Sequence, residues 1–256
     1  MAFRENLDSR SIMHQLDLSM DFLSSLPAWC GEALRDFRST ISDSAFPCFY
    51  AAGSNLYFSF VNSIRLDREA VAKYLEQYIA ILKSFQASEA ALAARTLLVI
   101  FEMPRGENVD MDAYERDTWE LLQFLLNSDR QPWPKDIPSD PDTPKWEFCF
   151  GGSPLFVNVC TPSHVHRRSR NLGSSLALVV QGREGIDYCA PPTAEGDRTR
   201  EAIRSRLDQY DRIVRCPDLN VYGSESNREW KLYFLSDDNV QRTTSCPIRR
   251  TPHRDT

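Results

Sequence analysis

The densest group of residues able to bind a metal lies in one short segment, Cys160–Gly173. The chain has only four histidines, and two of them, His164 and His166, lie in this segment. The segment also carries one thiol and three guanidinium groups: Cys160, Arg167, Arg168 and Arg170. An imidazole or a thiolate can bind haem iron, and guanidinium groups can pair with the haem propionates. The segment therefore suits a haem site, with His164 or Cys160 as the ligand and the three arginines as propionate partners.

Two other interpretations fit the same residues. If the segment is extended, His164 and His166 face the same side, and both could bind non-haem iron together with a distant carboxylate such as Glu102. Alternatively, the segment is a basic surface loop with two exposed histidines, because the pattern His-x-His is short and unspecific. The spacing alone does not choose among the three interpretations.

Three acids are candidates for a catalytic pocket: Glu102, Asp117 and Glu147. A substrate with a cationic end needs a carboxylate partner, which is the role that we assign to them. Taken singly, each acid could also cap a helix or stay solvated at the surface.

Apolar periodicity predicts the elements that position these groups. In the first part of the chain we expect a helix over Asp21–Arg38, a hairpin, and a helix from an Asp67 cap to about Phe85. The hairpin would pair Ala45–Ala52 with Leu56–Val61 through Gly53-Ser54-Asn55. A buried strand follows over Thr96–Met103.

In the second part, Asp112 with Glu115 resembles a capping box that opens a helix to about Asn127. Five prolines then fall within Pro132–Pro144, where they disfavour both helix and central strand. The embedded Trp133 indicates a loop pinned onto the core. The remaining expected strands are Leu155–Val159, Ser175–Val180 and Trp230–Leu235, and the remaining expected helix is Thr199–Tyr210.

Interleaved strands and helices predict an α/β fold, with α+β as the alternative, in which helices flank a mixed sheet in a single domain. We expect an N-terminal helical segment, residues 1–44, packed on the core. The α/β domain would span residues 45–238, and a flexible polar tail would follow over residues 239–256.

Composition narrows the classes of function. The net charge is −6 and the sequence pI about 5.3, which argues against a nucleic-acid partner. No signal peptide and no apolar run of about 20 residues is present, so we expect a cytoplasmic location and no membrane span. The seven cysteines form no CxxC pair, and the chain has neither a G-x-S-x-G elbow nor a phosphate-binding P-loop.

Several separated motifs resemble the YqcI/YcgG-like family, over roughly residues 46–238. They are Thr118-Trp119-Glu120, Pro132-Trp133-Pro134, Lys145-Trp146-Glu147-Phe148, Phe156-Val157-Asn158, Arg167-Arg168-Ser169-Arg170-Asn171-Leu172-Gly173, Ile203-Arg204-Ser205-Arg206, Tyr222-Gly223 and Asn227-Arg228-Glu229-Trp230-Lys231. Members of that family with known activity are haem-dependent N-hydroxylases that act on guanidine groups.

This resemblance implies b-type haem, dioxygen as co-substrate, and external electrons from a donor protein or another reductant. The substrate would be arginine, a guanidine or a similar amine. The segment around Pro162 corresponds to the region where such enzymes hold haem; some relatives carry His-Pro there, whereas this chain has Thr161-Pro162 with His164 two residues on. The rival functions are a non-haem iron oxygenase using His164 and His166, and a non-enzymatic module that binds a small ligand. The sequence does not decide whether the protein is a homodimer, what its exact substrate is, or whether His164, His166 or Cys160 is the axial iron ligand.

Overall fold

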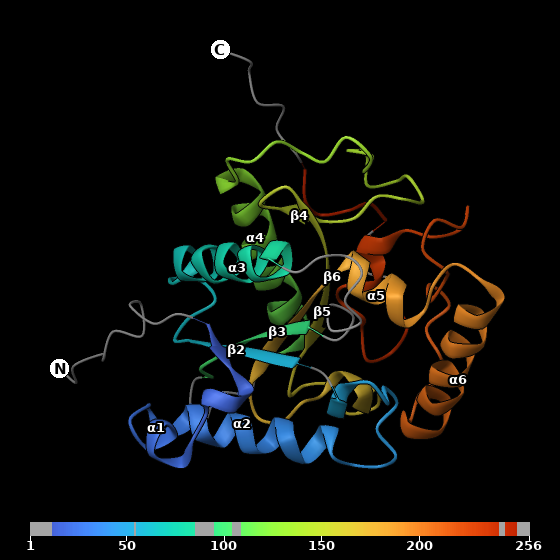
Figure 1. Cartoon of the computed structure of the whole chain (residues 1–256). Helices are drawn as coiled ribbons and strands as arrows, with labels where there is room; N and C mark the ends of the chain where they lie inside the picture. The colour runs from blue at the N-terminus through green and yellow to red at the C-terminus, as the bar shows by residue number, and fades with distance from the viewer. Residues whose placement is uncertain (1–11, 54, 85–94, 104–108, 241–243, 250–256) are drawn as a thin grey trace.

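A mixed sheet of six strands forms the centre of the computed structural model, which describes residues 12–53, 55–84, 95–103, 109–240 and 244–249 (Figure 1). The strands lie in the order β1-β2-β3-β6-β5-β4. Their bounds are β1 Met13–His14, β2 Asn55–Val61, β3 Arg95–Phe101, β4 Cys149–Phe150, β5 Ser153–Cys160 and β6 Leu176–Gly182. Strands β2 and β3 are parallel, and every other neighbouring pair is antiparallel. The predicted α/β fold with a mixed sheet is confirmed.

Helices cover both faces of this sheet. The α-helices are α1 Met20–Ser24, α2 Ala28–Ile41, α3 Arg68–Ser84, α4 Met111–Ser128, α5 Arg183–Cys189 and α6 Ala194–Tyr210. Short 3-10 helices are η2 Gln15–Asp17, η3 Ala51–Gly53, η5 Arg168–Arg170 and η6 Glu229–Leu232. Helices α3 and α4 lie on one side of the sheet, and α1 and α2 lie on the other (Figure 1). No helix within the described ranges combines the length and the apolar character that crossing a bilayer requires.

Strand β3 shows why the sheet is buried on both faces. Its residues Leu97, Val99 and Phe101 join the hydrophobic cluster that contains the α3 and α4 side chains. The alternate residues Leu98 and Ile100 join the cluster formed with α2. Because successive strand side chains point to opposite faces, a continuous apolar run is what a strand between two helical layers needs.

The predicted hairpin is wrong. Ala45–Ala52 forms turns and η3, and β2 pairs with β1 and, in parallel, with β3. Phe46 packs edge to face on Tyr210 of α6, with ring centroids 5.8 Å apart, so this aromatic segment fills a gap between helices. Pro47 lacks the N–H that a paired strand would donate. Ser54, in the expected turn, lies outside the described residues.

Two helix boundaries also differ from prediction. The helix expected over Asp21–Arg38 is divided into α1 and α2 at Pro27, which lacks the N–H that a continuous helix needs. Helix α4 is capped by Asp110, whose carboxylate accepts a 2.7 Å hydrogen bond from the Ala113 N–H. Asp112 therefore lies in the first turn and is not the cap.

The last predicted strand, Trp230–Leu235, is the 3-10 helix η6 followed by an irregular segment. The Tyr233 carbonyl accepts a 3.0 Å hydrogen bond from the Val159 N–H of β5. The Tyr233 hydroxyl donates a 3.3 Å hydrogen bond to the Leu155 carbonyl of the same strand. Farther on, Cys246 and Ile248 are buried in the core, so this part of the segment expected to be a flexible tail is packed.

The proline-rich loop is pinned, as predicted. The Trp133 indole N–H donates a 2.7 Å hydrogen bond to the Ile137 carbonyl. The same side chain packs against the core, and Trp146 is only 3% exposed.

Candidate functional site

The Cys160–Gly173 segment connects β5 to β6, and one of its two histidines, His164, is buried. His164 Nε2 lies 2.7 Å from the carbonyl oxygen of Leu235, and Nδ1 lies 2.9 Å from the Thr161 hydroxyl. A carbonyl only accepts, so Nε2 carries the proton and Nδ1 accepts from Thr161. Burial lowers the pKa of His164 to about 4. His164 is therefore a neutral imidazole with both nitrogens engaged.

The three arginines of the segment bind the protein's own backbone and rings. The buried Arg170 guanidinium donates to the carbonyls of Leu232 and Tyr233, at 3.0 and 3.2 Å. Arg167 donates through Nε to the Ser236 carbonyl at 2.9 Å. Arg168 instead lies over an aromatic ring, that of Tyr210, at 4.4 Å from the centroid. These contacts occupy the groups that we expected to pair with propionates.

Hydrogen bonds also hold the backbone of the rest of the segment in place. The Asp237 carboxylate accepts hydrogen bonds from three successive backbone N–H groups, those of Val165, His166 and Arg167. The histidine of that run, His166, is exposed. Burial raises the pKa of the Cys160 thiol to about 12, which disfavours a thiolate there. In the described arrangement, the residues of this segment do not fit a haem group.

The non-haem alternative has no geometric support. Glu102 is exposed at the end of β3, His164 is buried and His166 is exposed, so they do not converge. Across the described ranges, no group of three or more His, Cys, Asp or Glu residues is placed to hold a metal ion.

The other two candidate acids bind arginines of the chain itself. Asp117 lies on α4 and is largely buried, and its carboxylate lies 2.9 Å from Nε of Arg65. Glu147 is fully buried and lies beside Arg183. The three predicted acids therefore do not line one pocket.

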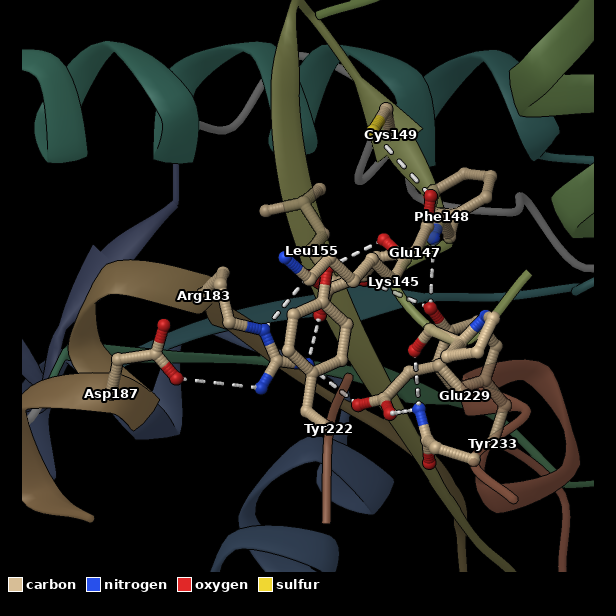
Figure 2. Close-up of polar contacts among 12 residues, drawn as sticks. Lys145, Glu147, Phe148, Cys149, Leu155, Arg183, Asp187, Tyr222, Glu229 and Tyr233 are labelled. Carbon is tan, nitrogen blue, oxygen red and sulfur yellow. Dashed lines mark hydrogen bonds and ion pairs between the residues drawn. The ribbon is translucent and has the colours of Figure 1, made fainter. Parts of the chain in front are cut away.

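Glu147 belongs to a buried ionic group, here called the Arg183 cluster (Figure 2). The Arg183 Nε and Nη2 atoms donate to the two Glu147 oxygens at 2.8 and 2.6 Å. Nη2 also donates to Glu229 at 2.5 Å, and the guanidinium carbon lies 3.9 Å from the Tyr222 ring centroid. Asp187, one helical turn along α5, lies 3.7 Å from Nη1. The cluster links α5 and η6 to Glu147, which lies in the segment just before β4.

Burial and the Arg183 guanidinium determine which members of the cluster are charged. Burial raises the pKa of Glu147 to about 7, although the Arg183 hydrogen bonds oppose the rise. Burial lowers the pKa of Arg183, but the neighbouring carboxylates outweigh it and raise the pKa above its usual value. Arg183 is therefore always charged, and Glu147 is the member that can take up a proton near neutral pH.

Next to this cluster, a hollow separates α4 from η6. A cavity of about 50 Å³ is lined by Trp119, Trp230 and Lys231 among others. A larger groove of about 700 Å³ runs along α4, and the two spaces share Glu115 and Trp119 as lining residues. Periodicity did not indicate this hollow, because it forms between segments that are far apart in the sequence.

One cysteine that the sequence did not single out has surroundings that suit a thiolate better than those of Cys160. Cys48 is half-buried, and burial raises the pKa of its thiol. The backbone N–H groups of Tyr50 and Ala51 and the Arg206 guanidinium offset part of that rise. Arg206 also donates to the Phe46 carbonyl at 2.7 Å, which fixes the turn that carries Cys48. The sequence predicts a strand over Ala45–Ala52, but the part that carries Cys48 is a turn.

Comparison with known proteins agrees with the motifs. A family model described as the YqcI/YcgG family matches residues 37–249. The chain is 37% identical to a Bacillus subtilis protein named "Uncharacterized protein YcgG", over 87% of this chain and 89% of that one. It is 33% identical to a Streptomyces lavendulae protein named "Putative N(omega)-hydroxy-L-arginine synthase DcsA", over 87% and 85%. A second Bacillus subtilis protein, "Uncharacterized protein YqcI", is 34% identical over 88% and 90%. No solved structure matches the chain.

Proposed function

Since this chain belongs to the YqcI/YcgG family, we propose that it is an N-hydroxylase that oxidises a nitrogen of arginine, a guanidine or a similar amine. The observation that carries the proposal is the similarity, along most of both chains, to the relative named for N(omega)-hydroxy-L-arginine synthesis. The reaction inserts one oxygen atom of dioxygen into an N–H bond and reduces the other to water, using two external electrons and two protons. A donor protein or another reductant supplies the electrons.

The proposed cofactor is b-type haem, which when bound supplies the activation of dioxygen. The β5–β6 connection does not fit it, because His164 is hydrogen-bonded at both nitrogens and the nearby arginines bind backbone carbonyls. We therefore propose Cys48 as the protein ligand. Burial raises the pKa of its thiol, but the backbone N–H groups of Tyr50 and Ala51 and the Arg206 guanidinium offset part of that rise. Iron bound at the sulfur would itself favour the thiolate.

The α4 groove is not the place of the reacting group in this proposal. Trp119 and Phe124, which line the groove, pack in the hydrophobic cluster on the α3 and α4 face of the sheet. Cys48 packs against the cluster on the α2 face. The sheet therefore separates the groove from the proposed iron ligand, and the substrate class rests on the similarity to the relative.

The test is a product assay on the purified protein. Incubation with dioxygen, a reductant and a panel of amines, followed by mass spectrometry, should give a product heavier by one oxygen atom from arginine or a related guanidine. Binding of such ligands without any oxidised product, in protein with a full haem spectrum, would favour the rival function, a non-enzymatic ligand-binding module.

A further inference from the structure

The two cysteines that are not buried lie in adjoining segments of the fold. Five of the seven cysteines are buried, and the other two, Cys48 and Cys189, are half-buried thiols. Cys48 lies in the turn before η3, and Cys189 is the last residue of α5. The Tyr50 hydroxyl donates a 3.2 Å hydrogen bond to the Cys189 carbonyl, a contact between residues 139 apart in the sequence. The fold therefore brings together the two accessible thiols of the chain.

Helix α6 holds both of these segments through two arginines. The Arg206 Nε atom donates a 3.2 Å hydrogen bond to the carbonyl of Pro47, directly before Cys48. Farther towards the start of the helix, Arg200 donates through Nη1 to the carbonyl of Ala190, at 2.6 Å, directly after the other cysteine. One helix therefore fixes the backbone beside each thiol, so that their proximity does not depend on the Tyr50 contact alone.

Electrostatics shows that the two sulfur atoms are close. Burial raises the pKa of the Cys189 thiol, and the charge of a Cys48 thiolate raises it further, because like charges at short range repel each other. Burial also raises the pKa of the Cys48 thiol. Neither is therefore a strongly acidic thiol that reacts readily by itself. What favours reaction between them is proximity, which replaces an encounter in solution by a step within one molecule.

The backbone at both positions suits a bond between the two sulfurs. A disulfide needs an S–S distance of about 2.05 Å and Cα atoms about 5.5–6 Å apart. Cys48 lies in a turn and Cys189 at a helix end, so neither position belongs to a strand. Closing the bond therefore moves two connecting segments and disturbs no strand pairing.

We propose that Cys48 and Cys189 form a reversible disulfide, with hydrogen peroxide as the oxidant. The thiolate of one cysteine attacks a peroxide oxygen, the O–O bond breaks, and a sulfenic acid and one water molecule form once a proton is taken up. The sulfur of the other cysteine then attacks the sulfenic sulfur and releases the second water molecule. The two thiols lose two electrons and two protons in total, and the peroxide gains them. A dithiol reductant reverses the reaction by thiol–disulfide exchange.

The disulfide has a consequence for haem that rests on the proposed function. A sulfur in a disulfide is no longer a thiolate, so oxidation of the haem-free chain withdraws the proposed iron ligand, Cys48. Conversely, iron bound at Cys48 protects that sulfur from the reaction. Hydrogen peroxide is also the product formed when dioxygen receives two electrons and no substrate is oxidised.

The experiment maps the bond in the full-length protein, purified under reducing conditions in haem-loaded and haem-free form. After removal of the reductant, each sample is treated with hydrogen peroxide, alkylated with N-ethylmaleimide and digested with trypsin without reduction. Mass spectrometry of the haem-free sample should show the peptide of residues 39–65 linked to that of residues 184–198, with the loss of two hydrogen atoms. Dithiothreitol should remove the link and restore two thiols to alkylation.

Variants identify the two sulfurs. Cys48→Ser and Cys189→Ser should each lose the linked peptide. Cys216→Ser is the matched control and should keep it, because Cys216 is buried in a separate hydrophobic cluster. The measurement on the wild-type protein decides the matter if a variant does not fold.

The outcomes separate this inference from the proposed function. If the haem-free wild type forms no link between the two peptides, or links Cys48 to several cysteines without preference, the inference is overturned, whichever residue binds iron. If the link forms in haem-free protein and is lost in protein with a full Soret band, the inference and the proposed ligand both stand. If the link forms equally with a full Soret band, the disulfide stands and Cys48 is not the iron ligand.

Discussion

The imidazole of His164 donates a 2.7 Å hydrogen bond from Nε2 to the carbonyl oxygen of Leu235. This contact ties the β5–β6 connection to the C-terminal segment, and the Arg170 and Arg167 side chains reinforce it from either side. The residues that looked most like a metal site in the sequence therefore join two distant segments of the fold.

A first prediction concerns the pH dependence of stability at His164. Its folded pKa, about 4, lies below its ordinary value of 6.5, so the unfolded chain binds the proton more readily between the two values. The stabilising contribution is complete above about pH 6.5 and is lost as the pH falls towards about 4, and it amounts to on the order of 3 kcal/mol. Glu147 acts in the opposite sense, because its raised pKa favours the folded state at low pH.

In the wild type, the effects of His164 and Glu147 on the pH dependence of stability offset each other. The free energy of unfolding of each variant is therefore compared with that of the wild type at each pH. For His164→Gln, the deficit in the free energy of unfolding, measured by urea titration, should be largest near neutral pH and should shrink towards about pH 4. His166→Gln, at the exposed neighbour, should follow the wild type. A His164→Gln deficit that is constant with pH would show that the imidazole is not held neutral.

A second prediction concerns Arg183. Arg183→Met leaves Glu147 and Glu229 buried without their partner and should lower the free energy of unfolding by about 3–5 kcal/mol. Arg183→Lys should restore little, because an ammonium cannot form the paired contacts with Glu147.

The matched control is Arg215→Met, which breaks an ion pair with Asp208 at the surface and should cost about 0–1 kcal/mol. Equal losses for Arg183→Met and Arg215→Met, in chemical unfolding, would mean that the Arg183 cluster contributes no more than a surface pair.

A third prediction concerns the haem ligand. Cys48→Ser should abolish or shift the Soret band of protein purified after expression with a haem precursor, because it removes the thiolate that we propose as the ligand. Cys189→Ser is the control, since Cys189 is the other cysteine that is not buried among the described residues. A Soret band unchanged by Cys48→Ser but lost on His164→Gln would return the ligand to the β5–β6 connection.

Local pattern was enough to predict most helices and the strands β2, β3, β5 and β6, because each helix has an apolar stripe and each strand is a short run rich in apolar residues. It failed where pairing depends on distant partners. The aromatic-rich Ala45–Ala52 has strand composition, yet its side chains fill space beside α6. Trp230–Leu235 looked like a strand, but η6 is held in place by Glu229 and Arg183.

The candidate site was predicted less well for a related reason. The acceptor of the His164 proton lies 71 residues along the chain, and it is a backbone carbonyl that carries no sequence signature. The same holds for the acceptors of Arg170. Scarcity of histidine correctly drew attention to a special segment, but it could not separate a buried imidazole with both nitrogens bonded from a free iron ligand.

The most direct test of the proposed function uses isotopically heavy dioxygen with L-arginine, a reductant and the purified haem-loaded protein. We expect N(omega)-hydroxy-arginine that carries one heavy oxygen atom, detected by mass spectrometry, and no product when dioxygen is withheld. Label found only in water, or an unmodified arginine and guanidine panel in protein with a full Soret band, would contradict the assignment of this chain as an N-hydroxylase.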